Sequence, residues 1–233
     1  MPSFRVITIG NIATGKTSLL NALMGEVLLP HFNCPVNIRF GKSPNATIYS
    51  EKPAHFQFNV CVEDLRKFID NKDINRVTIE FPIKFRDFDF VDIPGLSWEN
   101  RFKDIIMNYL PTANVILYCM DVTRALTVSE MTEIELLRKL GYDSMIFVLT
   151  HFDNLEYEDM INDMINHADK ARQYYTNRLS NYTNLGPEGV FFTGSKQSLM
   201  GKNKNEASMV CSSHLLELEI KLKGLYAKWQ SLH

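Results

Sequence analysis

Residues 10–17 read GNIATGKT and match the pattern GxxxxGK[ST], in which x is any residue. A run of β-forming residues, 4–9, precedes this stretch, and the segment 16–24, whose apolar residues recur at helical spacing, follows it. Two glycines let the backbone curl around a phosphate chain, so that consecutive N–H groups and the positive end of the helix face the anion. The stretch therefore predicts a strand, a phosphate-binding loop and a helix.

Within this loop, Lys16 is expected to reach the β- and γ-phosphates of a nucleotide, and the Thr17 hydroxyl is expected to ligate Mg²⁺. A chance match in an ordinary turn is the alternative, and the position between a buried strand and a helix argues against it. The residues that we expect to contact the phosphates are Gly10, Asn11, Ala13, Thr14, Gly15, Lys16, Thr17 and Ser18.

A second motif, DIPG at residues 92–95, follows another apolar strand. Asp92 is expected to hold Mg²⁺ through a water, and the Gly95 N–H to meet the γ-phosphate. Glycine would let this segment swing away once that phosphate leaves. The alternative is a simple turn, because Pro-Gly is common in turns.

Two further segments follow strands and are expected to bind the base. Residues 150–153 read THFD, and the Asp153 carboxylate can accept hydrogen bonds from the N1–H and 2-amino groups of guanine, which adenine lacks on that edge. Residues 193–196 read TGSK, and a backbone N–H there would bind guanine O6. The alternatives are an Asp that caps the following helix and an ordinary loop. The expected base-binding residues are Thr150, His151, Asp153, Gly194, Ser195 and Lys196.

Apolar strands alternate with helical segments, which predicts an α/β fold with a mainly parallel sheet covered on both faces. Strands are predicted at 4–9, 47–49, 56–62, 77–81, 85–91, 115–120, 145–149 and 190–192. Helices are predicted at 16–24, 64–70, 100–110, 128–140 and 156–179. Segments 27–46 and 196–206 are expected to be loops, and 77–91 a hairpin. Residues 1–210 form one predicted domain, followed by an amphipathic helix within 211–233 that Ser213 would cap and that packs on the domain or leads to a stalk.

Composition narrows the class of protein. The 233 residues include 25 Lys and Arg against 27 Asp and Glu, so the net charge of -2 argues against nucleic-acid binding. We find no apolar run long enough for a membrane span and no signal peptide. The four cysteines show no metal-ligand spacing, which predicts reduced thiols in a cytoplasmic protein.

The four motifs in this order resemble the signature of GTPases. Between them, LLNALMG at 19–25 and NYLPTANVI at 108–116 are similar to the GTPase domain of the dynamin superfamily, in particular to bacterial dynamin-like proteins. The Thr-His pair at 150–151 is also similar to septin-related GTPases of chloroplast import and immunity, which we keep as a second family.

The resemblance implies a Ras-like phosphate-loop GTPase fold with an antiparallel extension. It further implies GTP as substrate, GDP as product and Mg²⁺ as cofactor. The implied partners are the guanine nucleotide, a second GTPase domain in a homodimer, and a membrane surface bound through regions outside this chain.

Three residues depart from the dynamin pattern. Ala13 stands where a phosphate-loop Ser is usual, Asn37 where the first switch has a Thr, and His151 where the base motif has a Lys. The residues assigned to catalysis are Lys16, Thr17, Asn37 and Gly95, and those assigned to the metal are Thr17, Asp92 and Asn37. Because losing a group that stabilises the transferring phosphoryl costs about 10³ to 10⁵ in rate, we expect slow intrinsic hydrolysis that a partner or dimerisation stimulates. The alternatives are a nucleotide-dependent interaction switch with negligible hydrolysis and an ATP-using phosphate-loop enzyme.

Overall fold

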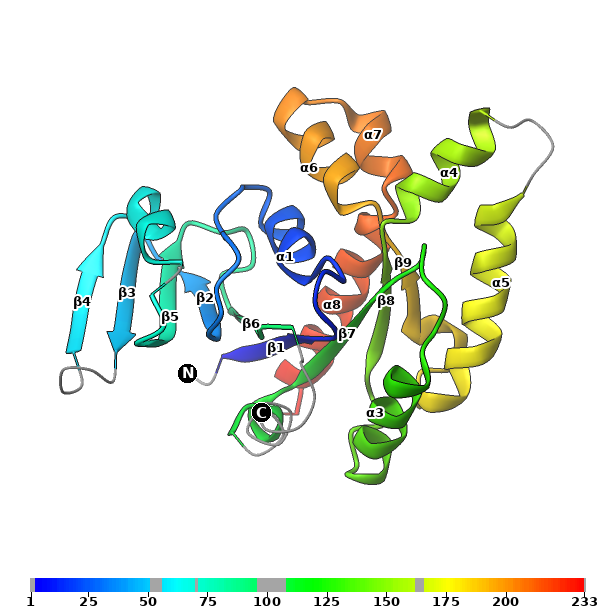
Figure 1. Ribbon diagram of the computed structural model, residues 1–233, viewed down its shortest axis with the longest axis horizontal. Coiled ribbons are helices and arrows are strands. Elements are labelled where there is room, and N and C mark those ends of the chain that lie inside the picture. Colours follow the sequence, from blue (N-terminus) through cyan, green and yellow to red (C-terminus); the bar gives the residue numbers. More distant parts are fainter. Residues whose placement is uncertain (1–2, 51–55, 70, 96–107, 162–165, 233) are drawn as a thin grey trace.

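The computed structural model describes residues 3–50, 56–69, 71–95, 108–161 and 166–232. These residues form a nine-stranded sheet in the order β4-β3-β5-β2-β6-β1-β7-β8-β9, with helices on both faces (Figure 1). The strands are β1 Phe4–Ile9, β2 Val36–Phe40, β3 Asn45–Ser50, β4 Phe56–Val60, β5 Ile74–Phe81, β6 Phe88–Asp92, β7 Val115–Asp121, β8 Ile146–Thr150 and β9 Val190–Phe192. The longer helices are α1 Lys16–Met24, α3 Val128–Lys139, α4 Phe152–Ile161, α5 His167–Leu179, α6 Ser195–Lys204, α7 Ala207–Ser212 and α8 Leu215–Gln230. The described ranges also contain the 3₁₀ helices η1 Val62–Phe68, η2 Leu110–Thr112, η3 Ser180–Tyr182 and η4 Gly186–Gly189.

The half of the sheet from β6 to β9 is parallel, as the sequence predicts. Strands β7 and β8 are buried along their whole length, which explains their nearly unbroken apolar sequence. The carboxyl ends of β1, β6, β7 and β8 meet at one edge of the sheet, so the segments that follow these strands are brought together there.

The other half of the sheet is the antiparallel extension, and here two predictions are wrong. Residues 36–40 are not a loop but strand β2, which pairs parallel with β5 and antiparallel with β6. Because β2 lies between them, β5 and β6 do not form the predicted hairpin. Only three apolar residues alternate in β2, and prolines precede it, so the local pattern was too short to predict a strand.

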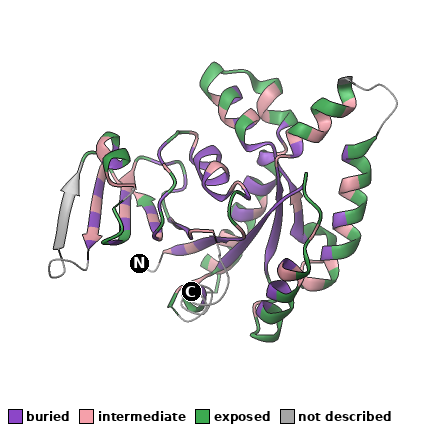
Figure 2. Ribbon diagram, in the orientation of Figure 1, coloured by how far each residue is buried: buried purple, intermediate pink, exposed green. Residues whose placement is uncertain are grey.

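Each face of the sheet has its own apolar cluster. Strands β1, β7 and β8 are almost entirely buried between them (Figure 2). On one face, α1 and α8 cover the sheet, and Leu215, Leu218 and Leu222 of α8 are fully buried there. The predicted apolar stripe of the last helix is confirmed, with Leu225 and Trp229 packed at its far end. On the opposite face, α3 and α5 cover the sheet.

Two helical predictions also change. The polar segment 196–206, expected to be a loop, forms most of α6, because Ser198 and Gly201 are buried and Gly201 packs closely against Met209 of α7. The single helix expected at 156–179 is two helices, α4 and α5. Most of the helix expected at 100–110 lies outside the described residues.

The acidic residues of α3 are not all exposed to solvent. Glu130 forms a capping box with Thr127 at the start of α3. Glu133 is only 2% exposed and accepts a 2.6 Å hydrogen bond from the hydroxyl of Tyr118 on β7. Glu135 alone of the three is exposed. The helix therefore buries two carboxylates, each with a donor.

Candidate nucleotide-binding site

The loop at residues 10–15 turns tightly between β1 and α1. Gly10 has φ 138°, and a Cβ added there would lie 2.2 Å from the carbonyl oxygen of Cys119 on β7. Gly15 has φ 74°, and its Cβ would lie 3.1 Å from the side chain of Thr150 on β8. Only glycine fits these two positions, and the glycines let the loop rest on the ends of the neighbouring strands. The local structure is thus the strand, loop and helix that the sequence predicts.

Lys16 turns its side chain back into this loop. Its Nζ donates hydrogen bonds to the carbonyl oxygens of Gly10 at 3.0 Å and Asn11 at 2.6 Å. Burial lowers the pKa of Lys16, while the nearby acidic groups of Cys119 and Asp92 act in the opposite direction. The loop therefore holds a buried cation at its centre.

The proposed metal ligands Thr17 and Asp92 touch. The hydroxyl of Thr17 donates a 2.7 Å hydrogen bond to Oδ2 of Asp92, and the Thr8 hydroxyl lies 3.1 Å from Oδ1. Burial raises the pKa of Asp92, and the hydrogen bond from Thr17 and the charge of Lys16 offset part of that effect. Hard oxygen donors around a buried carboxylate fit Mg²⁺, whose charge would stabilise the ionised form.

The DIPG segment lies against the phosphate loop. A Cβ on Gly95 would come within 2.6 Å of the Cα and 2.8 Å of the backbone nitrogen of Ile12. Gly95 is therefore in contact with the tip of the loop, on the side where the last phosphate of a bound nucleotide is expected. Ile12 itself is 63% exposed, and Ala13 beside it is exposed with φ 61°.

Asn37 is not brought to the pair formed by Thr17 and Asp92. It lies within β2, where Val36 pairs with Asp92 and Asn37 pairs with Val91. Paired residues share a face of the sheet, and successive residues alternate between faces. The side chain of Asn37 therefore lies on the face opposite to the Asp92 carboxylate, and its assignment to the metal stays a prediction that needs β2 to rearrange.

The two base motifs and the phosphate loop line one small pocket. Its lining residues are Gly15, Ser18, Thr150, His151, Asp153, Asn154, Ser195 and Lys196. Asp153 is in the first turn of α4, and a Cβ on Gly194 would lie 2.8 Å from the Cβ of Asp153. Burial raises the pKa of Asp153, against hydrogen bonds from the backbone N–H groups of Asp153 and Gln197. Segments more than 130 residues apart along the chain thus converge on one carboxylate.

The TGSK segment contributes to this pocket through its later residues. The N–H of Gly194 donates a 2.9 Å hydrogen bond to the carbonyl oxygen of Ser213, so this N–H is already used. Ser195 begins α6, and its buried Oγ has no hydrogen-bond partner within the part of the chain that the structure describes. Lys196 follows it and is exposed.

His151 is held by a residue that the sequence analysis missed. Its backbone is left-handed, with φ 59°, and its Nδ1 lies 3.3 Å from Oδ1 of Asp121. Hydrogen bonds from Thr123 and the charges of His151 and Arg124 more than offset burial and lower the pKa of Asp121. Asp121 directly follows the apolar run of β7, and that position at the carboxyl edge of the sheet was the available signal.

Thr150 ties the base motif to the phosphate loop. Its Oγ1 lies within hydrogen-bond distance of the carbonyl oxygens of Thr14, at 2.9 Å, and Met120, at 3.0 Å. Thr150 therefore lines the candidate base pocket and also holds the phosphate loop in place. The carbonyl of Asn11 accepts a hydrogen bond from the buried hydroxyl of Thr14 at 2.9 Å, which further fixes the loop.

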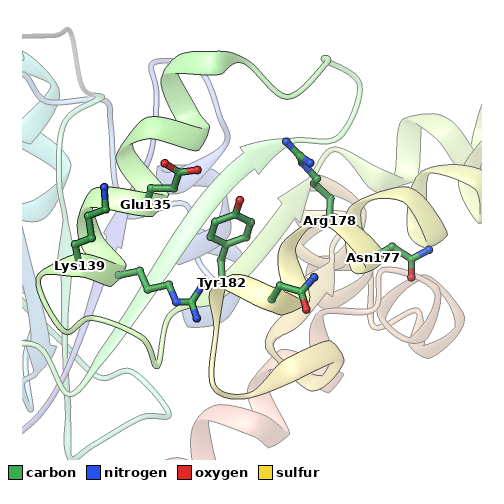
Figure 3. A pocket seen from close by; sticks show the side chains of 7 residues that line it. Glu135, Lys139, Asn177, Arg178 and Tyr182 are labelled. Carbon is green, nitrogen blue, oxygen red and sulfur yellow. The ribbon is translucent and has the colours of Figure 1, made fainter.

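An open pocket lies away from this site, between α3 and the end of α5 (Figure 3). Its charged lining residues are Glu135, Arg138, Lys139 and Arg178. The three cations stand in the last turns of their helices, where positive charge stabilises the helix ends. Helix-end stabilisation thus accounts for them.

The comparisons with known proteins agree with this geometry. The family model described as "Dynamin family" matches residues 6–152, more than half of the chain, and the chain therefore belongs to the dynamin family. Membership identifies it as a dynamin-superfamily GTPase domain, and the first of the two families that the sequence resembles is confirmed.

Two curated relatives are similar along most of the chain. A bacterial dynamin-like protein of Nostoc punctiforme is 24% identical, over 87% of this chain and 34% of its own length. A protein of Caldicellulosiruptor sp., described as an uncharacterized protein in the xynA 3′ region, is 22% identical, over 95% of this chain and 56% of its own length. The chain thus spans between one third and somewhat over half of these relatives.

Solved structures show the same fold. Two chains from work on an oligomerised bacterial dynamin pair superpose with TM-scores of 0.68 and 0.62 at 20% and 17% identity. They cover 94% and 98% of this chain, which spans 37% and 42% of theirs. The predicted α/β GTPase fold is confirmed. No helix in the described ranges combines the length and hydropathy of a membrane span.

Proposed function

We propose that this chain binds GTP and GDP with Mg²⁺ and hydrolyses GTP slowly on its own. One observation carries the proposal: a single pocket is lined by the phosphate loop, the THFD segment and the TGSK segment, with Asp153 at its wall. The family, whose members are GTPases, supports the same reading. Cytoplasmic localisation is part of the proposal.

At the base end, the carboxylate of Asp153 would accept hydrogen bonds from the N1–H and 2-amino groups of guanine. Binding guanine would compensate the cost of burying this carboxylate, whereas adenine would add no donor to those of the backbone. The orphaned Oγ of Ser195 supplies a further polar atom at the wall of the pocket. The carboxylate is the feature that favours a purine with donors on its Watson–Crick edge, because the hydroxyl of Ser195 can either donate or accept.

At the phosphate end, the residues neutralise and position charge. Lys16 would turn part of its donor capacity from the loop carbonyls to the β- and γ-phosphates. Thr17 and Asp92 would hold Mg²⁺, which supplies charge stabilisation to the phosphate oxygens when bound. Gly95 would offer its N–H to the γ-phosphate, so GTP and GDP would hold the DIPG segment differently.

Hydrolysis would proceed by in-line attack of water on the γ-phosphorus, with GDP leaving. Two observations favour a slow rate. Ala13 offers a methyl group where the dynamin pattern has a hydroxyl, and Asn37 faces away from the metal pair. Because the charge that stabilises the transition state is incomplete, a second GTPase domain or another partner is proposed to supply the rest.

The same two residues favour one alternative, an interaction switch that binds GTP, captures a partner and releases almost no phosphate. A homodimer through the GTPase domain is part of either version. The structural relatives come from an oligomerised bacterial dynamin pair for which sensing and tethering of membranes is described. We propose that regions outside this chain give it a peripheral membrane role.

Calorimetric titration with GDP, xanthosine diphosphate (XDP), GTP and ATP in the presence of Mg²⁺ tests which nucleotide the protein prefers. The wild-type protein is expected to prefer GDP to XDP, and Asp153→Asn to reverse that preference, because xanthine has an acceptor where guanine has an amine. Glu158→Gln, an exposed carboxylate on the same helix, is the matched control. Equal affinity for ATP and GTP supports an ATP-using enzyme instead, and the absence of binding to any of the four overturns the proposal.

Single-turnover assays at several protein concentrations test the rate. Phosphate release is expected to be slow at high dilution and to accelerate as the protein concentration rises. Fast release at high dilution contradicts the slow intrinsic rate. Negligible release at every concentration, with tight GTP binding retained, supports the switch.

A further inference from the structure

The short junction between α7 and α8 lies behind the base pocket. Ser213 in this junction is fully buried, and His214 directly after it is 25% exposed at its side chain. His214 has φ 55° and ψ 8°, in the left-handed region that a residue with a Cβ seldom adopts. A strained backbone of this kind persists only where the surroundings hold it.

The imidazole of His214 is held from both sides. Nε2 lies 3.0 Å from Oε1 of Glu156 on α4, and Nδ1 lies 3.3 Å from Oε1 of Glu217 on α8. Because an ionised carboxylate only accepts, a hydrogen bond between Glu156 and Nε2 requires the ring proton on Nε2. The edge of the ring packs on Phe152, with the ring centroids 5.9 Å apart.

A cation completes this cluster. The guanidinium of Arg172 on α5 lies 4.4 Å from the ring centre of Phe152 and 4.9 Å from that of Phe192. Its Nη2 lies 3.4 Å from Nε2 of His214. Side chains of α4, α5 and α8 therefore surround one imidazole, and Phe192 of β9 packs on Arg172 beside it.

The same junction also holds the TGSK segment. The carbonyl of Ser213 accepts the hydrogen bond from the Gly194 N–H at 2.9 Å, and Oγ of Ser212 accepts one from Nε2 of Gln197 at 3.0 Å. Gly194 in turn packs on Asp153. One junction thus contacts both segments that form the base pocket.

The geometry points to His214 as a positioning residue for base selection. Glu156 follows Asp153 by three residues and lies on the same side of α4, so its bond to His214 fixes the first turn of that helix. Ser213 fixes the facing segment at the same time. His214 sets the distance between Asp153 and the TGSK segment without touching the nucleotide, and this role rests on the proposed guanine-nucleotide binding.

The discriminating variant is His214→Asn. Asparagine tolerates the left-handed backbone, so the chain path is preserved, but its short side chain does not reach Glu156. We compare GDP with inosine diphosphate, which lacks the 2-amino group that Asp153 recognises. The selectivity ratio is the dissociation constant of inosine diphosphate divided by that of GDP. Loss of the hydrogen bond between the 2-amino group and Asp153 is expected to lower this ratio about tenfold. Glu217→Gln, which changes only the exposed partner, is expected to keep the wild-type ratio.

The positioning role requires that His214→Asn change the selectivity ratio. Loss of a residue with a merely structural role would weaken the binding of both nucleotides by the same factor. A second variant, Glu156→Ala, removes the partner from α4 and is expected to lower the same ratio, also if His214→Asn does not fold. The double variant is expected to lower the ratio little further than either single variant, because both substitutions remove the same bond between His214 and Glu156. His214→Gln, with an amide that can donate to Glu156, is expected to restore part of the ratio.

Three outcomes decide the matter. A folded His214→Asn protein with the wild-type ratio overturns the positioning role and leaves the proposed function intact. A ratio that falls equally in Glu217→Gln also overturns it, because the effect then belongs to the end of α8. A wild-type protein that binds neither GDP nor inosine diphosphate overturns the proposed function and this inference together.

Discussion

The hydroxyl of Thr17 donates a hydrogen bond to the buried carboxylate of Asp92 across the gap between α1 and β6. This bond, the hydroxyl of Thr8 and the charges of Lys16 and His31 offset part of the burial of Asp92. The pair is therefore arranged for a ligand that brings positive charge, at a cost to the stability of the ligand-free protein.

Asp92→Asn should stabilise the ligand-free protein and weaken Mg²⁺-dependent nucleotide binding. Because the pKa of Asp92 is raised in the folded state, the folded protein retains this proton longer than the unfolded chain, and stability falls as pH rises from the unfolded pKa through the folded pKa. Asp92→Asn has no carboxyl group at this position, so its stability does not fall with pH in this way. At neutral pH we expect its Tm to be higher by roughly 2–4 °C.

Thermal denaturation between pH 4 and pH 8, with and without Mg²⁺ and GDP, measures both effects. Asp89→Asn on the same strand, whose carboxylate is paired with Arg5 nearer the surface, is the control. An Asp92→Asn protein that is less stable than wild type at pH 7 without ligand would show that burial does not destabilise this carboxylate.

Gly95→Ala should weaken the binding of GTP more than that of GDP. The added Cβ would lie 2.6 Å from the Cα of Ile12, so the DIPG segment must move away from the phosphate loop. We expect GTP affinity to fall about tenfold through loss of the γ-phosphate contact, and GDP affinity to stay within about twofold. Gly224→Ala, where nothing lies within 4 Å of the added atom, is the matched control. Equal losses for both nucleotides would count against the γ-phosphate role.

Tyr118→Phe should destabilise the fold because it leaves the buried Glu133 without its donor. The expected loss is about 1–3 kcal/mol of unfolding free energy in urea denaturation. Burial raises the pKa of Glu133 and the Tyr118 hydrogen bond lowers it, so the variant raises the pKa further and should lose more stability at pH 8 than at pH 5. The double variant Tyr118→Phe, Glu133→Leu removes both polar groups and should recover part of the loss. A pH-independent loss would show that Glu133 stays neutral in both proteins.

Glu219→Gln should loosen the attachment of α8. Glu219 is 7% exposed at its side chain and accepts from Lys84 at 2.5 Å and Lys202 at 2.9 Å, and Lys202 also donates to the carbonyl of Ala22 on α1. The lysines are partly exposed, so we expect a loss of about 1–2 kcal/mol rather than that of a fully buried pair. Glu188→Gln, which breaks the exposed pair with Lys221, should cost under about 0.5 kcal/mol. Similar losses in the two variants would contradict this ranking.

Sequence patterns predicted the parallel half of the fold because its signals are local. The GNIATGKT loop stands directly between its strand and its helix, and β7 and β8 are continuous apolar runs. Strand β2 and helix α6 were missed because tertiary contacts stabilise them more than their own sequence patterns do. Strand β2 is paired on both sides, and the polar α6 packs on α7 and donates from Lys202 to the carbonyl of Ala22 on α1.

The convergence of the motifs on one candidate site was predicted for a similar reason. The four motifs could be placed because each follows a strand at one edge of the sheet. The supports around them were not visible: His214 is 58 residues from Glu156 and 42 from Arg172, and no local pattern links them. Asn37 was assigned from the dynamin pattern, and its place inside β2 could not be deduced before β2 was known.

Helix α8 joins two remote parts of the domain in one rigid element. It begins at His214 beside the base pocket, and after 16 residues, or about 24 Å, its last turns place Tyr226 and Trp229 on Phe4, at the start of β1. Between these two ends, Leu215, Leu218 and Leu222 pack the helix on the sheet, so a displacement of its last turns would have to disturb these contacts before it reached His214. Helix α8 therefore braces the first strand and the junction at His214 against the same face of the sheet.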